Sequence, residues 1–336
     1  MPRYFGHGLP SNPRVAVIAN DAIGNFVVST PLLQMIRREL SPSFIHYYGG
    51  TRTLEMQAAS DLFEWDYPLH GTPFGQACRD SRGPYDLVIN VERTENAMGL
   101  AGFLETPETA ICGPYVGKRG PEPYGTDDRA ALWQDQNWIA EDLTEKYPFL
   151  QSGFIAEIFA RLAYLEGPVP AYKVPTEAIQ SGCDILIATS ASLPEKLWPL
   201  SSWLEVLKAL NDHGLTVGLI GAKPSAQREH WKGDSDEESM VACGLVRDLR
   251  GAFTLPQVVG ALGACRLVLS LDNGILHLAC AARQDGIVGL TRFGIHRLWT
   301  PKNPGLKVLT SEPGGMVSDI PVDVVLEACR QSWRDA

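Results

Sequence analysis

The sequence predicts an α/β protein of two domains, each a parallel sheet covered by helices. Short apolar runs alternate with longer segments of helical periodicity in both halves of the chain. This is the pattern of parallel strands joined by crossover helices. A length of 336 residues exceeds what one ordinary core holds and suits two domains. The chain is 45% apolar and 20% charged, as a globular protein should be.

The N-terminal half opens with an apolar strand at 14–19, a polar loop at 20–24 and an amphipathic helix at 27–40. The segment 105–150 is rich in Pro, Gly, Trp and charge, so short helices or a functional loop are expected there. Its rings and charges suit a sugar or phosphate group, and they suit a packed surface loop equally well. Further strands are expected near 43–48, 62–66, 85–90 and 109–112, and helices near 53–60, 94–104 and 151–166.

Three prolines interrupt regular structure between 167 and 175 and predict a linker. The domains are therefore expected at 1–170 and 176–320, followed by a C-terminal helix at 321–336. In the second half, strands are expected near 184–188, 215–220, 245–249, 266–271, 286–290 and 306–309, and helices near 201–212, 225–231, 255–263 and 274–283.

The most informative segment is a strand, turn and helix at 267–282. Its apolar run ends on Asp272, Asn273 and Gly274, and His277 falls in the first turn of the helix. Such a turn presents backbone N–H groups and a partial positive charge, so it predicts an anion site. Because Asp-Asn-Gly is common turn chemistry, an ordinary βα unit with a buried histidine is the alternative.

A second polar loop follows the strand at 184–188. It carries the hydroxyls of Thr189, Ser190 and Ser192, and then Lys196 just before a Trp-Pro pair. Hydroxyl groups and a compact lysine cation suit phosphate oxygens. Alone, Lys196 would be read as a surface lysine before a helix.

Together the two motifs resemble the nucleotide-sugar half of glycosyltransferase family 9, the heptosyltransferases. The intervening passages agree in order and spacing, so the resemblance covers the C-terminal half well. It implies the GT-B fold, in which two Rossmann-like domains, for acceptor and donor, face each other across a cleft. The passages that carry it are Lys196-x-Trp198-Pro199, Leu215 to Gly221, Asp248-Leu249-Arg250-Gly251, Thr254-Leu255, Asp272-x-Gly274-x-x-His277, Gly289 to Gly294 and Trp299-Thr300-Pro301.

The N-terminal half matches at one place, where Gly24 and the later Thr30-Pro31 resemble the family's loop glycine and helix. In the family the residue after that glycine is an aspartate, regarded as the general base. Here it is Asn25, whose amide cannot accept a proton. Asp21, four residues earlier, could supply the carboxylate, and it could equally cap the loop backbone.

The resemblance implies a metal-independent inverting glycosyltransferase that moves a heptose-like sugar from a nucleoside-diphosphate sugar, ADP-linked, to an acceptor hydroxyl. A nucleotide-sugar-binding homologue with lost or altered transfer, or a GT-B-fold epimerase, are the alternatives. No G-x-G-x-x-G follows a strand, which disfavours a dehydrogenase. No cofactor or metal is expected. The predicted site residues are Asp21 and Asn25 for catalysis, and Thr189, Ser190, Ser192, Lys196, Asp272, Asn273, Gly274 and His277 for donor binding.

A net charge of −10 argues against nucleic acid as a partner. The expected partners are the nucleotide sugar and a glycan or small-molecule acceptor, with peripheral membrane contact if that acceptor is lipid-linked. Arg37-Arg38 and Lys118-Arg119 are basic pairs that could meet an anionic acceptor. Seven scattered cysteines without a C-x-x-C pair, and no apolar leader or spanning segment, predict a cytoplasmic protein.

Overall fold

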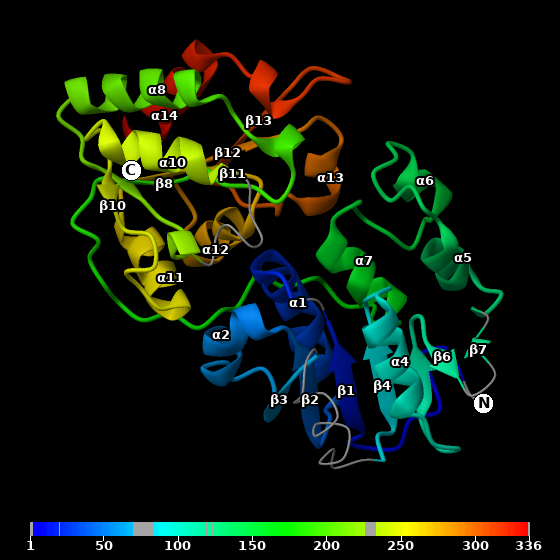
Figure 1. Cartoon of the computed structure of the whole chain (residues 1–336). Helices are drawn as coiled ribbons and strands as arrows, with labels where there is room; N and C mark the ends of the chain where they lie inside the picture. Colours follow the sequence, from blue (N-terminus) through cyan, green and yellow to red (C-terminus); the bar gives the residue numbers. More distant parts are fainter. Residues whose placement is uncertain are drawn as a thin grey trace. The chain divides into compact units, whose positions relative to one another are not determined.

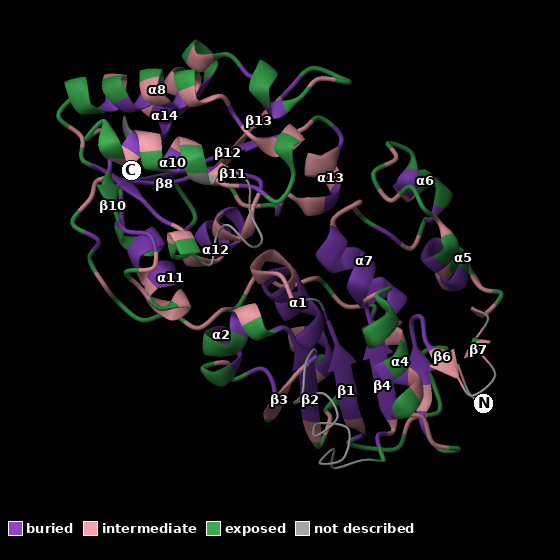
Figure 2. Ribbon diagram, in the orientation of Figure 1, coloured by how far each residue is buried: buried purple, intermediate pink, exposed green. Residues whose placement is uncertain are grey.

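The computed structural model describes residues 3–19, 21–69, 84–117, 120–122, 124–225 and 233–334 (Figure 1). The chain divides into two compact units, Met1–Lys173 and Val174–Ala336, called unit 1 and unit 2 below. Each unit has a parallel sheet of its own whose central strands are buried (Figure 2). The predicted α/β class with two Rossmann-like domains is confirmed at this level.

Unit 1 is built on a five-stranded parallel sheet of order β3-β2-β1-β4-β5. Its strands are β1 (Arg14–Ile18), β2 (Phe44–Gly49), β3 (Trp65–Pro68), β4 (Leu87–Asn90) and β5 (Ala110–Cys112), and a small hairpin pairs β6 (Val116–Gly117) with β7 (Gly120–Pro121). Its helices are α1 (Ile23–Leu40), η1 (Thr51–Thr53), α2 (Leu54–Ala58), α4 (Glu95–Phe103), α5 (Asp128–Gln134), α6 (Leu143–Lys146) and α7 (Ile155–Leu162). Helices α1 and α7 pack together, and α4 covers the other face of the sheet.

Helix α1 contains Pro31, which removes one backbone N–H from its interior. The carbonyl of Val27 loses that donor, and the Thr30 hydroxyl donates to it instead at 2.8 Å. The same hydroxyl oxygen accepts from the backbone N–H of Lys173 at 3.2 Å. The Thr-Pro pair therefore keeps the helix continuous across the proline.

Unit 2 is built on a six-stranded parallel sheet of order β10-β9-β8-β11-β12-β13. Its strands are β8 (Ile185–Ala188), β9 (Val217–Leu219), β10 (Arg247–Asp248), β11 (Leu267–Leu271), β12 (Ile287–Thr291) and β13 (Leu306–Thr310). Its helices are η2 (Pro194–Lys196), α8 (Leu200–Asp212), α10 (Asp234–Ala242), α11 (Leu255–Ala264), α12 (Gly274–Ala282), α13 (Ile295–Trp299), η3 (Val317–Asp319) and α14 (Val322–Arg334). Helices α8 and α14 share one core with the sheet, in which Trp198 and Trp203 meet edge to face at 5.1 Å.

Both sheets reverse their strand order at one place. In unit 1 the reversal lies between β1 and β4, and in unit 2 between β8 and β11. In sheets of this kind the loops after the two strands at the reversal run to opposite sides, and ligands bind at the carboxyl edge between them. These two topological switch points position the candidate site residues of each unit.

Some expected elements differ from the structure. Helix α1 begins at Ile23 rather than near 27, because Ala22 is extended and its carbonyl already accepts from Phe26 N. Gly24 and Asn25 consequently lie in the first helical turn. Helix α10 was not expected, since its polar sequence has no apolar period. Most of the helix expected at 225–231 lies outside the described residues, as does the Lys118-Arg119 pair.

Candidate functional site

The two polar loops of unit 2 meet at its switch point. Strand β8 pairs with β11 in parallel register, with Ala188 opposite Ser270. Their carboxyl ends therefore lie side by side, and the loops that follow are neighbours. The sequence motifs separated by some eighty residues of chain thus form one site.

Two direct interactions join these loops. The Lys196 ammonium donates to Asp272 at 2.9 Å, and the Asn273 amide donates to the Ser190 carbonyl at 2.9 Å. The Asp272 side chain is only 6% exposed and that of Lys196 is 22% exposed. Because an ammonium has three N–H groups, Lys196 can hold Asp272 and still donate to an anion.

The Asn273 side chain caps helix α12. Its carbonyl oxygen accepts from the backbone N–H of Ile275 at 2.9 Å and of Leu276 at 3.4 Å. The expectation of free N–H groups at this turn is therefore wrong for these two residues. An anion at this helix start would depend on Lys196 and on the N–H of Gly274, together with the residual helix dipole.

His277 is buried in the first turn of α12, at 4% exposure. Burial lowers the pKa of its imidazole to about 4; the negative charge of Asp272 acts to raise this pKa, and the positive charge of Lys196 acts to lower it. The ring is consequently neutral near pH 7, with one nitrogen as donor and the other as acceptor. It lies within electrostatic reach of both members of the Lys196–Asp272 pair.

The hydroxyls of the first loop differ in their surroundings. Thr189 is buried and donates to Glu237 of α10 at 2.9 Å, whereas Ser192 is exposed. Glu237 also pairs at 3.4 Å with Arg250, which holds Asp248 at 2.8 Å. The Arg250 guanidinium lowers the pKa of Asp248. Sequence reasoning missed Glu237 and the pairing of Arg250, although Arg250 stands inside a motif that the family resemblance picked out.

The switch point of unit 1 holds the predicted catalytic pair. Asp21 accepts from Arg52 twice, from its backbone N–H and from its Nε, each at 3.1 Å. It lies against Gly50, where a Cβ would collide with the carboxylate. The side chain of Asn25, on the first turn of α1, makes no hydrogen bond with the part of the chain that is described.

The basic pair at the end of α1 lies elsewhere. Arg37 binds Glu64 at 2.6 Å and Arg38 binds Glu39 at 2.9 Å. Since a crossover helix runs back along the sheet, its last turn lies at the amino edge, away from the switch point. The structure therefore offers this pair no place beside Asp21 and Asn25.

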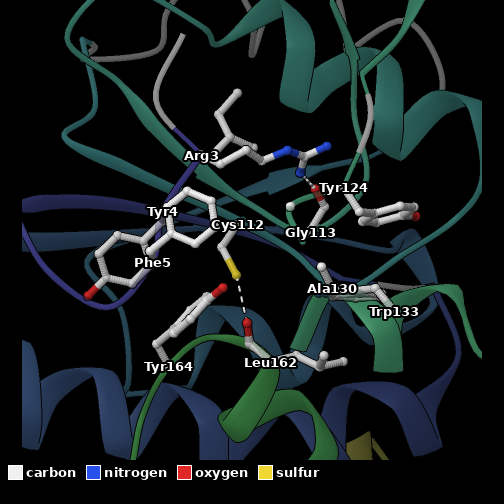
Figure 3. A pocket seen from close by; sticks show the side chains of 12 residues that line it. Arg3, Tyr4, Phe5, Cys112, Gly113, Tyr124, Ala130, Trp133, Leu162 and Tyr164 are labelled. Carbon is white, nitrogen blue, oxygen red and sulfur yellow. Dashed lines mark hydrogen bonds between the residues drawn. The ribbon is translucent and has the colours of Figure 1, made fainter. Parts of the chain in front are cut away.

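The aromatic segment at 105–150 packs on other parts of unit 1, with α5 against α7 and β6 against α4. Trp133 is 4% exposed and lines a small hollow with Arg3, Tyr124 and Tyr164 (Figure 3). The Arg3 guanidinium donates to the Gly113 carbonyl at its rim. A free volume of about 20 Å³ fits a single water and lies far below that of a sugar site.

Among the residues that the structure describes, no group of three or more His, Cys, Asp or Glu side chains could hold a metal ion. In the same residues, no helix has the length and apolar character needed to cross a membrane.

Comparison with known proteins finds similarity in fold over nearly the whole chain and similarity in sequence over part of it. Two solved structures align over nearly the whole chain: a glycosyl transferase family 9 protein from Veillonella parvula DSM 2008 (14% identity, TM-score 0.71, 98% of this chain and 99% of that one) and Escherichia coli ADP-heptose lps heptosyltransferase II (18%, 0.67, 96% and 99%). At such identities the likeness is one of fold. It defines the GT-B class of two Rossmann-like domains.

The sequence of unit 2 gives a more specific match than the fold does. Residues 172–311 match the family model for Glycosyltransferase family 9 (heptosyltransferase). Lipopolysaccharide heptosyltransferase 2 of Escherichia coli (strain K12) is 31% identical over 93 residues, which are 26% of this chain and 25% of that protein. The chain thus aligns with about a quarter of this relative. Residues 172–311 are thus similar to glycosyltransferase family 9, the heptosyltransferases, in the part of the chain where the motifs predict the resemblance.

Proposed function

We propose that this protein is a glycosyltransferase that moves a heptose-like sugar from an ADP-linked donor to an acceptor hydroxyl. The observation that carries the proposal is the switch point of unit 2, where the Lys196–Asp272 pair and the Asn273 cap join the two family motifs. An Escherichia coli relative in fold is called an ADP-heptose heptosyltransferase, which supports the choice of donor.

In this proposal Lys196 neutralises the diphosphate as it leaves, and the Gly274 N–H and the start of α12 assist it. Thr189, Ser190, Ser192 and His277 remain proposed donor-binding residues. The Thr189 hydroxyl already donates its hydrogen to Glu237. The nucleotide sugar could therefore only donate a hydrogen bond to the Thr189 oxygen. We further propose that the reaction needs no metal and inverts the anomeric centre by a single displacement.

A single displacement requires a base for the acceptor hydroxyl. Asp21 is the candidate that the sequence suggests. Arg52 donates to both of its carboxylate oxygens, to one from the backbone N–H and to the other from Nε. Asn25 would contact the acceptor as a hydrogen-bonding group and not as a base.

A second candidate function is nucleotide-sugar binding without transfer. The specific observation that favours it is the amide at position 25, where the family carries an aspartate. An epimerase of the same fold would act on the sugar of the donor itself, without any acceptor.

One experiment distinguishes these three functions. The chain is mixed with ADP-heptose, with and without lipopolysaccharide that lacks heptose, and ADP release and product mass are measured. Transfer gives a heavier acceptor and acceptor-dependent ADP release. Binding without either product would indicate the nucleotide-sugar-binding homologue, and ADP release without acceptor an epimerase-like or hydrolytic reaction. We propose a cytoplasmic location, with membrane contact only through the lipid of such an acceptor.

A further inference from the structure

A third loop of unit 2 borders the proposed donor site. Strand β12 pairs with β11 on the side away from β8, and the Asp272 N–H donates to the Leu290 carbonyl at 3.0 Å. This bond extends the parallel ladder by one residue, so Thr291 stands opposite Asp272. Arg292, the next residue, therefore leaves the sheet at the same carboxyl edge, one strand away from the Lys196–Asp272 pair.

The Arg292 side chain extends to the loop after β8. Its guanidinium lies 3.7 Å from the carboxylate of Glu195, which directly precedes Lys196 in η2. Lys196 in turn holds Asp272 at 2.9 Å. Three loops of one sheet edge thus bring two cations and two carboxylates together.

The two ion pairs differ in burial and in distance. The Asp272 side chain is 6% exposed, whereas those of Arg292 and Glu195 are 38% and 37% exposed. Their separation of 3.7 Å is also longer than a charge-assisted hydrogen bond. Because exposed pairs of this kind contribute little free energy, Arg292 can leave Glu195 at small cost. Its planar guanidinium can then donate to two oxygens of one phosphate.

The main chain around Arg292 is anchored. Thr291 is paired with Thr310 in the ladder between β12 and β13. On the other side, the Phe293 N–H donates at 3.3 Å to the hydroxyl of Ser311, a residue that is 3% exposed. Only the side chain of Arg292 therefore has to move to meet a ligand at this edge.

We propose that Arg292 is a second cation of the diphosphate site and exchanges Glu195 for phosphate oxygens when the nucleotide sugar binds. The inference rests on the proposed function. Lys196 neutralises only part of the charge of a diphosphate, and the guanidinium adds positive charge from the opposite loop. Glu195 competes with the phosphate for Arg292 and repels the phosphate as well.

The first test is a calorimetric titration with ADP. Arg292→Ala should raise the Kd about tenfold, because a charge-assisted contact is lost. Arg266→Ala is the matched control, since Arg266 is also exposed but stands just before β11, at the amino edge of the sheet. Its Kd should stay within about twofold of the wild-type value. An unchanged Kd in Arg292→Ala would overturn the inference.

A second variant separates phosphate binding from a merely structural role of the pair. Glu195→Gln removes the competing anion and should lower the Kd for ADP, roughly two- to fivefold. If the pair only held η2 and Lys196 in place, the loss of either partner would weaken ADP binding. An unchanged or raised Kd in Glu195→Gln would therefore overturn the role of Arg292. A wild-type chain that does not bind ADP would instead overturn the proposed function itself.

Discussion

The two switch points have the same strand topology, but the side chains at them and their interactions differ. In unit 2 the two loops are tied by Lys196–Asp272 and by Asn273–Ser190, and the residues of the first pair belong to the passages of the family resemblance. In unit 1 the family's aspartate position is Asn25, and the nearby Asp21 is held by Arg52. The difference teaches that the resemblance to the family is carried by unit 2, whereas unit 1 departs from it at the position of the expected base. A changed acceptor, or a relocated base, is what such a divergence would produce.

The largest effect is expected when a buried ion pair is broken in either unit. Comparing the two units shows whether such a pair contributes only to stability. Glu237→Ala in unit 2 and Glu157→Ala in unit 1 each leave a buried arginine with one carboxylate fewer, at Arg250 and Arg161. Each should lower the free energy of unfolding by roughly 3–5 kcal/mol, measured by urea titration.

The two variants should differ in ligand binding. Glu237 accepts from Thr189 in the donor loop, so Glu237→Ala should also weaken ADP binding. Glu157→Ala should leave ADP affinity unchanged under conditions in which both variants are folded. Equal effects of the two variants on ADP affinity would contradict the assignment of the donor site to unit 2.

The next effect concerns pH and His277. Its folded pKa of about 4 lies below the unfolded value of 6.5, so between these values only the unfolded chain binds the proton. The free energy of unfolding should therefore fall as the pH is lowered from 6.5 to 4, by an amount on the order of 3 kcal/mol. Denaturant midpoints across this range measure the effect. A profile equally steep in His277→Gln would show that other groups cause it.

A smaller effect is expected at Lys196. Lys196→Ala removes a charge-assisted contact and should weaken ADP binding by roughly 1.5–3 kcal/mol, a factor of about 10 to 150 in Kd by calorimetry. Lys208→Ala, an exposed lysine on α8, is the control and should bind ADP normally. Identical affinities in the two variants would remove Lys196 from the donor site.

The smallest effect should be that of chelation. If Lys196 and the α12 start neutralise the diphosphate, transfer should survive EDTA within about twofold. Activity lost in EDTA and strictly restored by magnesium or manganese would refute the metal-independent mechanism.

The strands of both sheets could be predicted from the sequence. So could the proximity of the two motifs in unit 2. Apolar strands and glycine turns are local signals, and family spacing fixes which loops belong together. The start of α1 was misplaced because Ala22 carries no capping side chain that marks a helix start. The burial of Glu237 could not be predicted either, because α10 has several acidic residues and no apolar periodicity that would show which face is buried. No local sequence signal predicts the ion pair between Arg52 and Asp21, which are thirty-one residues apart.

The Asn273 side chain has a consequence for local opening. One end of this amide accepts from Ile275 N and Leu276 N, and the other end is anchored on the Ser190 carbonyl. If the loop after β8 moves away, the anchor is lost, and the two capped amides become more accessible to solvent. Hydrogen exchange at Ile275 and Leu276 would then report the motion of a loop some eighty residues earlier in the chain, so loop and helix start behave as one cooperative unit.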